Sequence, residues 1–236
     1  PAGFTLAARP VRGPPPEAGR GPWAVPAAGG ESMAWSVALA CASAGEPTEV
    51  FRPGLVPDPD AAAALARGLY PADTLTETGE TVLDFALWPY EDELFVGAFE
   101  RALLLCDRRL FRLDDDARRI ADTAAAALPG SHCGVLVLHT VIRGCWFRWY
   151  ESGRLLREVF VTAEDGVVVD LGERLPAERP FWRAIDAGAP DVPLPFDPEE
   201  FGLALAEAHM FGRGIADRGK DGFLPLELPL RRFKHA

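Results

Sequence analysis

Two basic side chains near the middle of the chain have types and spacing that could support chemistry. His139 ends an apolar run, Val135–Leu138, and Arg143 follows four residues later. An imidazole titrates near neutral pH and can act as a general base, and a neighbouring arginine can bind an anion. His139 and Arg143 are therefore the candidate catalytic residues. A histidine that only forms structural hydrogen bonds would give the same pattern.

A second group of reactive residue types is Ser131, His132 and Cys133, which are consecutive in the sequence. Adjacent residues of a strand point to opposite faces, so His132 is badly placed to activate Cys133 as a nucleophile. Together with His139 and Cys145 they offer potential zinc ligands, but zinc sites usually contain closely spaced ligand pairs of other spacings. We therefore predict no metal site and no cofactor.

A hairpin rich in aromatic residues and arginine must position these groups. Two apolar runs, 145–150 and 154–161, flank the tripeptide Glu151-Ser152-Gly153. A three-residue loop with Gly153 in the left-handed conformation pairs Tyr150 with Arg154. The alternative, a two-residue loop, would place Arg157 opposite Arg148, and like charges directly opposite each other are unfavourable. The sequence therefore favours the longer loop.

This register divides the hairpin side chains between two faces of a sheet. The inward face carries an apolar set interrupted only by Arg157: Cys145, Phe147, Trp149, Leu155, Val159 and Val161. The other face mixes aromatic and charged residues: Trp146, Arg148, Tyr150, Arg154, Leu156, Glu158 and Phe160. Trp, Tyr and Arg contribute much of the energy of protein interfaces. The candidate binding residues are therefore Trp146, Arg148, Tyr150 and Phe160, unless helices or loops cover this face.

Strand and helix signals along the rest of the chain set the fold class. Alternating apolar runs predict further strands at 35–41, 82–87, 94–99, 103–106, 135–140 and 167–171. N-cap and first-turn signals predict helices that begin at Asp58, Asp114 and Asp197 and end near residues 70, 128 and 211, with a shorter helix over 178–185. Residues 186–198 are rich in proline and predict an extended connector. The fold is therefore expected to be α+β: a single domain with a mostly antiparallel sheet and three to four helices packed on it.

Composition limits the classes of partner. The 236 residues are 48% hydrophobic and 25% charged, with a net charge of −11. An acidic surface repels phosphate backbones, so we expect no nucleic-acid partner. No apolar run approaches the roughly 20 residues of a membrane helix, so we also expect no membrane association. The four cysteines lie in or beside apolar runs without the spacing C-x-x-C, which is typical of reduced thiols in a cytoplasmic protein.

The first 32 residues differ from the rest. They are rich in proline and glycine and have little apolar periodicity, which predicts a disordered arm. Met33 follows directly, so one hypothesis is that it is the native start and that the globular domain spans 33–236. In a competing interpretation, Met33–Cys41 is the apolar part of a signal peptide.

Several segments together resemble an uncharacterised, mainly actinobacterial protein family that is classed as a domain of unknown function. The similar segments span about residues 33–215 and are 48–52, 57–61 with 69–71, 138–139, 150–153, 170–176, 178–182, and 194–198 with Gly202. Around Arg143–Cys145 the sequence departs from the pattern of this family, which weakens any site built on Arg143. The resemblance implies no activity.

The sequence therefore favours a cytoplasmic, non-enzymatic binding or interaction protein whose partner is an unknown protein or small molecule. The alternative is an enzyme, a hydrolase or transferase acting on a small polar substrate, with His139 in its cleft. A carboxylate or thiol within hydrogen-bond reach of His139 would favour the enzyme. A third possibility is a purely structural partner of the product of a neighbouring gene.

Overall fold

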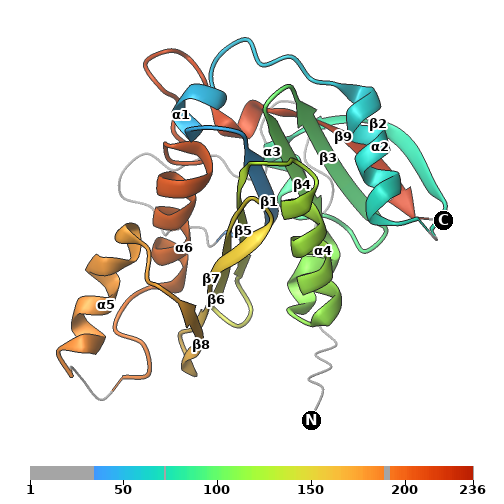
Figure 1. Ribbon diagram of the computed structural model, residues 1–236. Coiled ribbons are helices and arrows are strands. Elements are labelled where there is room, and N and C mark those ends of the chain that lie inside the picture. Colours follow the sequence, from blue (N-terminus) through green and yellow to red (C-terminus); the bar gives the residue numbers. More distant parts are fainter. Residues whose placement is uncertain (1–34, 72, 189–191, 236) are drawn as a thin grey trace, which may run out of the picture. The chain divides into compact units, whose positions relative to one another are not determined.

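One antiparallel sheet of nine strands organises the described part of the chain. The computed structural model describes residues 35–71, 73–188 and 192–235. The strands stand in the order β2-β9-β3-β4-β1-β5-β6-β7-β8, and every neighbouring pair is antiparallel (Figure 1). Their bounds are β1 (Val37–Ser43), β2 (Leu75–Val82), β3 (Glu93–Phe99), β4 (Ala102–Asp107), β5 (His132–His139), β6 (Gly144–Glu151), β7 (Arg154–Thr162), β8 (Gly166–Gly172) and β9 (Pro229–His235). The predicted α+β class with an antiparallel sheet is confirmed.

Six α-helices accompany the sheet in the described residues, rather than the three to four predicted. They are α1 (Pro47–Val50), α2 (Pro59–Leu69), α3 (Leu83–Ala86), α4 (Asp115–Ala126), α5 (Arg179–Asp186) and α6 (Pro198–Ala206). The predicted helices correspond to α2, α4, α5 and α6. Side chains of Asp58, Asp114 and Asp197 cap α2, α4 and α6 as expected, each accepting a hydrogen bond from a backbone N–H in the first turn. The unpredicted α1 and α3 are single turns.

The helices pack on both faces of the sheet. The central strand β1 is buried on both faces, because Val37, Leu39 and Cys41 belong to one apolar core and the intervening alanines to the other. The alanine face meets α4, whose inward residues are mostly alanine as well. Small side chains on both surfaces let the helix approach the strand closely. The opposite core packs against α6, which Figure 1 shows on the other side of the central strands from α4.

The hairpin forms, but its loop differs from the prediction. Glu151 pairs with Arg154, so the turn has two residues, Ser152 and Gly153, both with positive φ. A bulge at Leu156 then shifts the register and brings Glu158 opposite Arg148. The repulsion that argued against the short loop is thereby avoided. Beyond the bulge the predicted faces are correct: Phe147 lies opposite Val159 in the core. Leu155 and Leu156 exchange faces.

One predicted strand is wrong, and two observed strands were not predicted. Residues 82–87 do not form a strand: β2 ends at Val82, and the turn α3 follows because Leu83 and Leu87, four residues apart, are both buried. β2 and β9 were not predicted, since both are rich in polar and charged residues. They pair through opposite charges, for example Arg231 with Glu77 and Glu80. Their signal is cross-strand charge complementarity, which apolar periodicity does not detect.

The predictions for residues 1–32 and for Met33 as the start lie outside the described residues, and so does part of the connector predicted over 186–198. Among the helices of the described residues, none has the length and apolar character needed to cross a membrane.

Candidate functional site

The candidate binding residues of the hairpin lie beneath helix α4. Trp146, Arg148 and Tyr150 are all at most 4% exposed. Arg148 Nη1 donates to Asp122 Oδ1 of α4 at 3.0 Å, and the Tyr150 hydroxyl donates to the same oxygen at 2.7 Å. The indole N–H of Trp146 donates to Glu158 at 3.0 Å. Arg148 and Tyr150 thus join α4 to the sheet, and Trp146 is buried beside them, so these three side chains do not form the exposed contact surface that the sequence suggested.

Phe160 is the exception among the four. It is only partly buried and packs at the margin of the core beneath α4. Its cross-strand neighbour is Val169 of the terminal strand β8. Phe160 is therefore the one predicted binding residue that remains near the surface.

The two candidate catalytic residues contact different neighbours. Arg143 lies in the turn between β5 and β6 with a φ of 43°, and its side chain is 70% exposed. Its nearest carboxylate is Asp197, the cap of α6, at 3.8 Å. His139 instead packs edge-on against the ring of Phe111, with ring centroids 5.6 Å apart. The predicted pair is thus divided between two surroundings.

His139 belongs to a cluster that the sheet assembles from distant segments. β4 and β5 both pair antiparallel to β1, so their carboxyl ends lie at the same end of the sheet. Arg108 directly follows β4, and His139 is the last residue of β5. At this end the N–H of Ala38 donates to Leu87 O, which positions Trp88. The cluster, hereafter the Arg108 cluster, consists of Trp88, Arg108, Phe111 and His139.

The Arg108 guanidinium rests on aromatic rings and not on a carboxylate. Its central carbon lies 4.3 Å from the ring centroid of Trp88 and 5.1 Å from that of Phe111. Its Nη1 is shielded from solvent without a hydrogen-bond partner, as is Nδ1 of His139. No ion pair within 4 Å joins Arg108 to a carboxylate of the described ranges. The cluster thus holds two nitrogens that have lost water and gained no acceptor.

Electrostatics within the Arg108 cluster favour a neutral histidine. Burial, and then the nearby positive charge of Arg108, lower the pKa of His139 below its ordinary value. Burial also lowers the pKa of Arg108, an effect that the more distant Glu91 carboxylate partly offsets. A bound anion would stabilise the positive charge on both groups. The cluster is therefore suited to bind an anion. It is poorly suited to make His139 a general base, because protonation of the ring is disfavoured.

The thiols offer no alternative nucleophile. All four cysteines are free and buried. Burial raises the pKa of each, that of Cys133 to about 12, so the thiolate is disfavoured. His132 packs on Trp149 at 5.5 Å between ring centroids, whereas Cys133 faces the opposite core, so the two point to different faces as expected.

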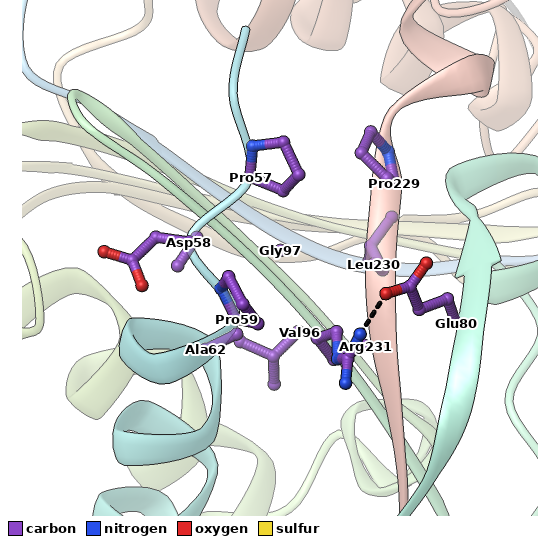
Figure 2. A pocket seen from close by; sticks show the side chains of 11 residues that line it. Pro57, Asp58, Pro59, Ala62, Glu80, Val96, Gly97, Pro229, Leu230 and Arg231 are labelled. Carbon is purple, nitrogen blue, oxygen red and sulfur yellow. Dashed lines mark hydrogen bonds and ion pairs between the residues drawn. The ribbon is translucent and has the colours of Figure 1, made fainter.

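A small apolar pocket lies elsewhere, where β9 stops pairing with β3. Val96 pairs with Arg231, so the residue opposite Ala98 would be Pro229, which has no N–H. The N–H of Asp58 donates to Ala98 O instead, at 2.8 Å. Between the two segments a recess of about 80 Å³ opens over Gly97 (Figure 2).

The charges on the rim of this pocket already have partners. Arg231 is ion-paired with Glu80, drawn in Figure 2, and with Glu77, and Asp58 caps α2 through Ala61 N. The pocket offers mainly apolar surface from proline, glycine and aliphatic residues. The Arg108 cluster, with its unpaired donors, is the stronger candidate.

Sequence reasoning identified His139 but missed Arg108, Trp88 and Phe111. The available signal was a basic residue at the end of the predicted strand 103–106, followed shortly by an aromatic residue. To predict that Arg108 lies near His139, one would have to know that β1 lies between β4 and β5.

Comparison with known proteins identifies the family of this chain. A family model described as a family of unknown function (DUF6928) matches residues 36–233, nearly the whole described region. No curated protein and no solved structure matches the chain.

Proposed function

The chain belongs to the family of unknown function DUF6928, and we propose that it is a non-enzymatic binding protein. Its ligand carries an oxyanion, a carboxylate or a phosphate, which the Arg108 cluster holds. We also propose a cytoplasmic location, which the four free and buried thiols support.

One observation carries this proposal: Arg108 is partly buried but has no carboxylate partner. Burying a charge without an acceptor is costly, and a protein with an excess of acidic residues has many carboxylates that could have filled the place. The planar guanidinium presents its donors at its edge, a geometry that matches two oxygens of a carboxylate or phosphate. Trp88 and Phe111 lie against the guanidinium, and its Nη1 has no hydrogen-bond partner, so this donor is available to a ligand that displaces the groups shielding it.

The surroundings of His139 support binding over acid–base catalysis. The charged group that most affects it is a cation, Arg108, and its ring packs against Phe111. A histidine acting as general base is usually oriented by a carboxylate. With no such acid among its neighbours in the described residues, His139 is better suited to donate a hydrogen bond to a bound anion.

The test measures anion binding by calorimetry and by the NMR shifts of the His139 ring. Benzoate and inorganic phosphate serve as probes and distinguish the two kinds of oxyanion. The Arg108→Met variant should weaken binding of the preferred probe roughly ten- to 150-fold, because hydrogen bonds to charged groups contribute about 1.5–3 kcal/mol.

Arg143→Met is the matched control, since it removes the same charge from an exposed arginine near the same end of β5. Its binding should remain close to that of the original protein. If neither probe binds at millimolar concentration, or if both variants lose affinity equally, the assignment of this site is wrong.

A further inference from the structure

The accessible surface of the Arg108 cluster is mainly aromatic. All four of its members, Trp88, Arg108, Phe111 and His139, keep part of their surface in solvent. The ring centroids of Trp88 and Phe111 are 4.8 Å apart, with the rings inclined at 58°, and both rings lie within cation–π range of the guanidinium. A ligand that reaches the nitrogens of the cluster therefore also meets aromatic surface.

Two exposed hydrophobic side chains flank the cluster along the chain. Tyr90 follows Trp88 by two residues and is 67% exposed, and Val141 follows His139 by two residues and is 68% exposed. Two residues span at most about 7 Å, so both side chains begin close to the cluster. Single exposed hydrophobic residues are common, but here two of them adjoin a partly exposed group of rings. The positive charge of Arg108 is thus bordered by apolar surface.

The charge of the cluster matches one negative charge better than two. Arg108 is the only one of its members that is charged at neutral pH, because burial and Arg108 itself lower the pKa of His139. The Glu91 carboxylate also acts on Arg108 and offsets part of its positive potential. A phosphate monoester carries about 1.5 to 2 negative charges near neutral pH, whereas a carboxylate carries one. The net charge of −11 adds to the repulsion of a second charge.

A backbone donor that would favour phosphate is already used within the chain. Arg108 opens a 3₁₀ helix, Arg108–Arg112, and free N–H groups at the start of a helix can bind phosphate. Here the Asp107 side chain caps that start and accepts from Arg109 N at 2.8 Å. The nitrogens without a partner are instead in side chains, Nη1 of Arg108 and Nδ1 of His139. Two such nitrogens suit the two oxygens of a carboxylate.

We propose that the ligand of the Arg108 cluster is a monocarboxylate attached to an aromatic ring, a proposal that rests on the oxyanion-binding function proposed above. The carboxylate accepts from Nη1 of Arg108 and from the ring of His139. The aromatic ring of the ligand packs on Trp88 and Phe111. Because Nη1 is shielded from solvent, the groups that cover it move aside when the carboxylate enters.

Calorimetry on the full chain with acetate, benzoate and inorganic phosphate tests the proposal. Benzoate should bind about tenfold more tightly than acetate, because only benzoate brings a ring to the aromatic surface. Phosphate should bind more weakly than benzoate. N-acetylphenylalanine identifies the source of the carboxylate. It should bind more tightly than benzoate if the natural ligand is the C-terminal end of a peptide, and more weakly if the ligand is a free aromatic acid.

A substitution beside the cluster tests the contribution of the apolar surface. Val141→Ser should weaken benzoate binding about threefold and leave acetate binding unchanged, because it removes apolar surface without changing charge. Val56→Ser is the matched control, since Val56 is 76% exposed. Its neighbour Pro57 pairs with Phe99, at the end of the sheet opposite to His139. This variant should bind benzoate like the original protein.

The failure of this proposal differs from the failure of the proposed function. Equal binding of acetate and benzoate, or tighter binding of phosphate, would overturn the aromatic carboxylate. If that binding is still lost in Arg108→Met, the oxyanion site itself stands. If no probe binds, or if Arg108→Met changes nothing, both proposals fail. Equal losses of benzoate affinity in Val141→Ser and Val56→Ser would contradict contact between the aromatic ligand and the surface beside His139.

Discussion

Two arginines of this protein show opposite solutions to burying a guanidinium. Arg157 of β7 is fully buried and fully paired: its Nε and Nη2 donate to the two oxygens of Glu178 at 2.8 and 2.7 Å. Its Nη1 donates to Asp170 and to Leu171 O. Arg108 is only partly buried, yet it has no acid partner in the described residues. At Arg157 the chain supplies an acceptor for each of the three guanidinium nitrogens.

The contrast extends to the surroundings of each arginine. Glu178 also accepts from the Trp182 indole at 2.7 Å and from Leu175 N at 3.0 Å, so every oxygen of the Arg157 site is used. This network joins α5 and the segment before it to the sheet. Within the described ranges, no side-chain hydrogen bond joins the Arg108 cluster to another element, and Nη1 of Arg108 and Nδ1 of His139 have no partner. Complete pairing indicates a structural role for Arg157, and the proposed ligand would supply the acceptors that the Arg108 cluster lacks.

The strongest test of this contrast removes the acid from the paired site. Glu178→Gln should lower the free energy of unfolding by about 3–5 kcal/mol, because it leaves a buried guanidinium without its main counter-charge. Asp186→Asn is the control, since Asp186 pairs with Arg174 at the surface and should contribute at most about 1 kcal/mol. Urea unfolding measures both. Equal effects would show that burial and pairing do not distinguish the two sites.

The backbone opposite Arg157 provides a second test. Gly172 pairs with Arg157, has a φ of +84°, and a Cβ there would collide with Leu156 O. Gly172→Ala should therefore destabilise the protein by about 1–3 kcal/mol, from strain and from displacement of the Arg157 strand. Gly54→Ala separates these causes, because Gly54 has a φ of +86° with nothing within 4 Å. A loss no larger than that of Gly54→Ala would mean that the close approach at Gly172 contributes nothing.

Arg108 should respond differently from the Arg157 site. Arg108→Met removes no ion pair, so the loss of stability should not exceed the about 0.5–1 kcal/mol of the cation–π contacts. Thermal and urea unfolding without added anions measure this. A loss comparable to that of Glu178→Gln would make Arg108 a structural residue and remove the reason for assigning a ligand to it.

The two sites also differ in how far the sequence reveals them. The sequence predicted helices with strong caps and strands with apolar alternation, because both signals are local. β2 and β9 were not predicted, because these strands lack apolar alternation and pair instead through charges on segments far apart in the chain. The hairpin residues were assigned to the correct faces beyond the bulge, but their burial depends on α4, which only the tertiary structure places over them.

The Arg108 cluster illustrates the same limit. His139 stands out in the sequence because it ends an apolar run, whereas Arg108 is one of many arginines. Only the insertion of β1 between β4 and β5 brings the two to one end of the sheet. Its chemistry therefore depends on topology, which residue spacing alone does not encode.

The titration of His139 gives the smallest and most specific prediction. Burial and then Arg108 lower its pKa, so in the folded state the neutral ring is favoured, while the unfolded chain has the ordinary value of 6.5. The unfolded state thus binds more protons between the folded pKa and 6.5, and stability falls as the pH drops through that window.

Arg108→Met should raise the pKa of His139, since one of its two lowering influences disappears. Burial remains, so the pKa should stay below 6.5. Saturating benzoate or phosphate should raise it in the original protein, because a bound anion stabilises the imidazolium. NMR titration of the ring measures all three cases. A pKa that Arg108→Met leaves unchanged would place the cation too far away for the two groups to share an anion.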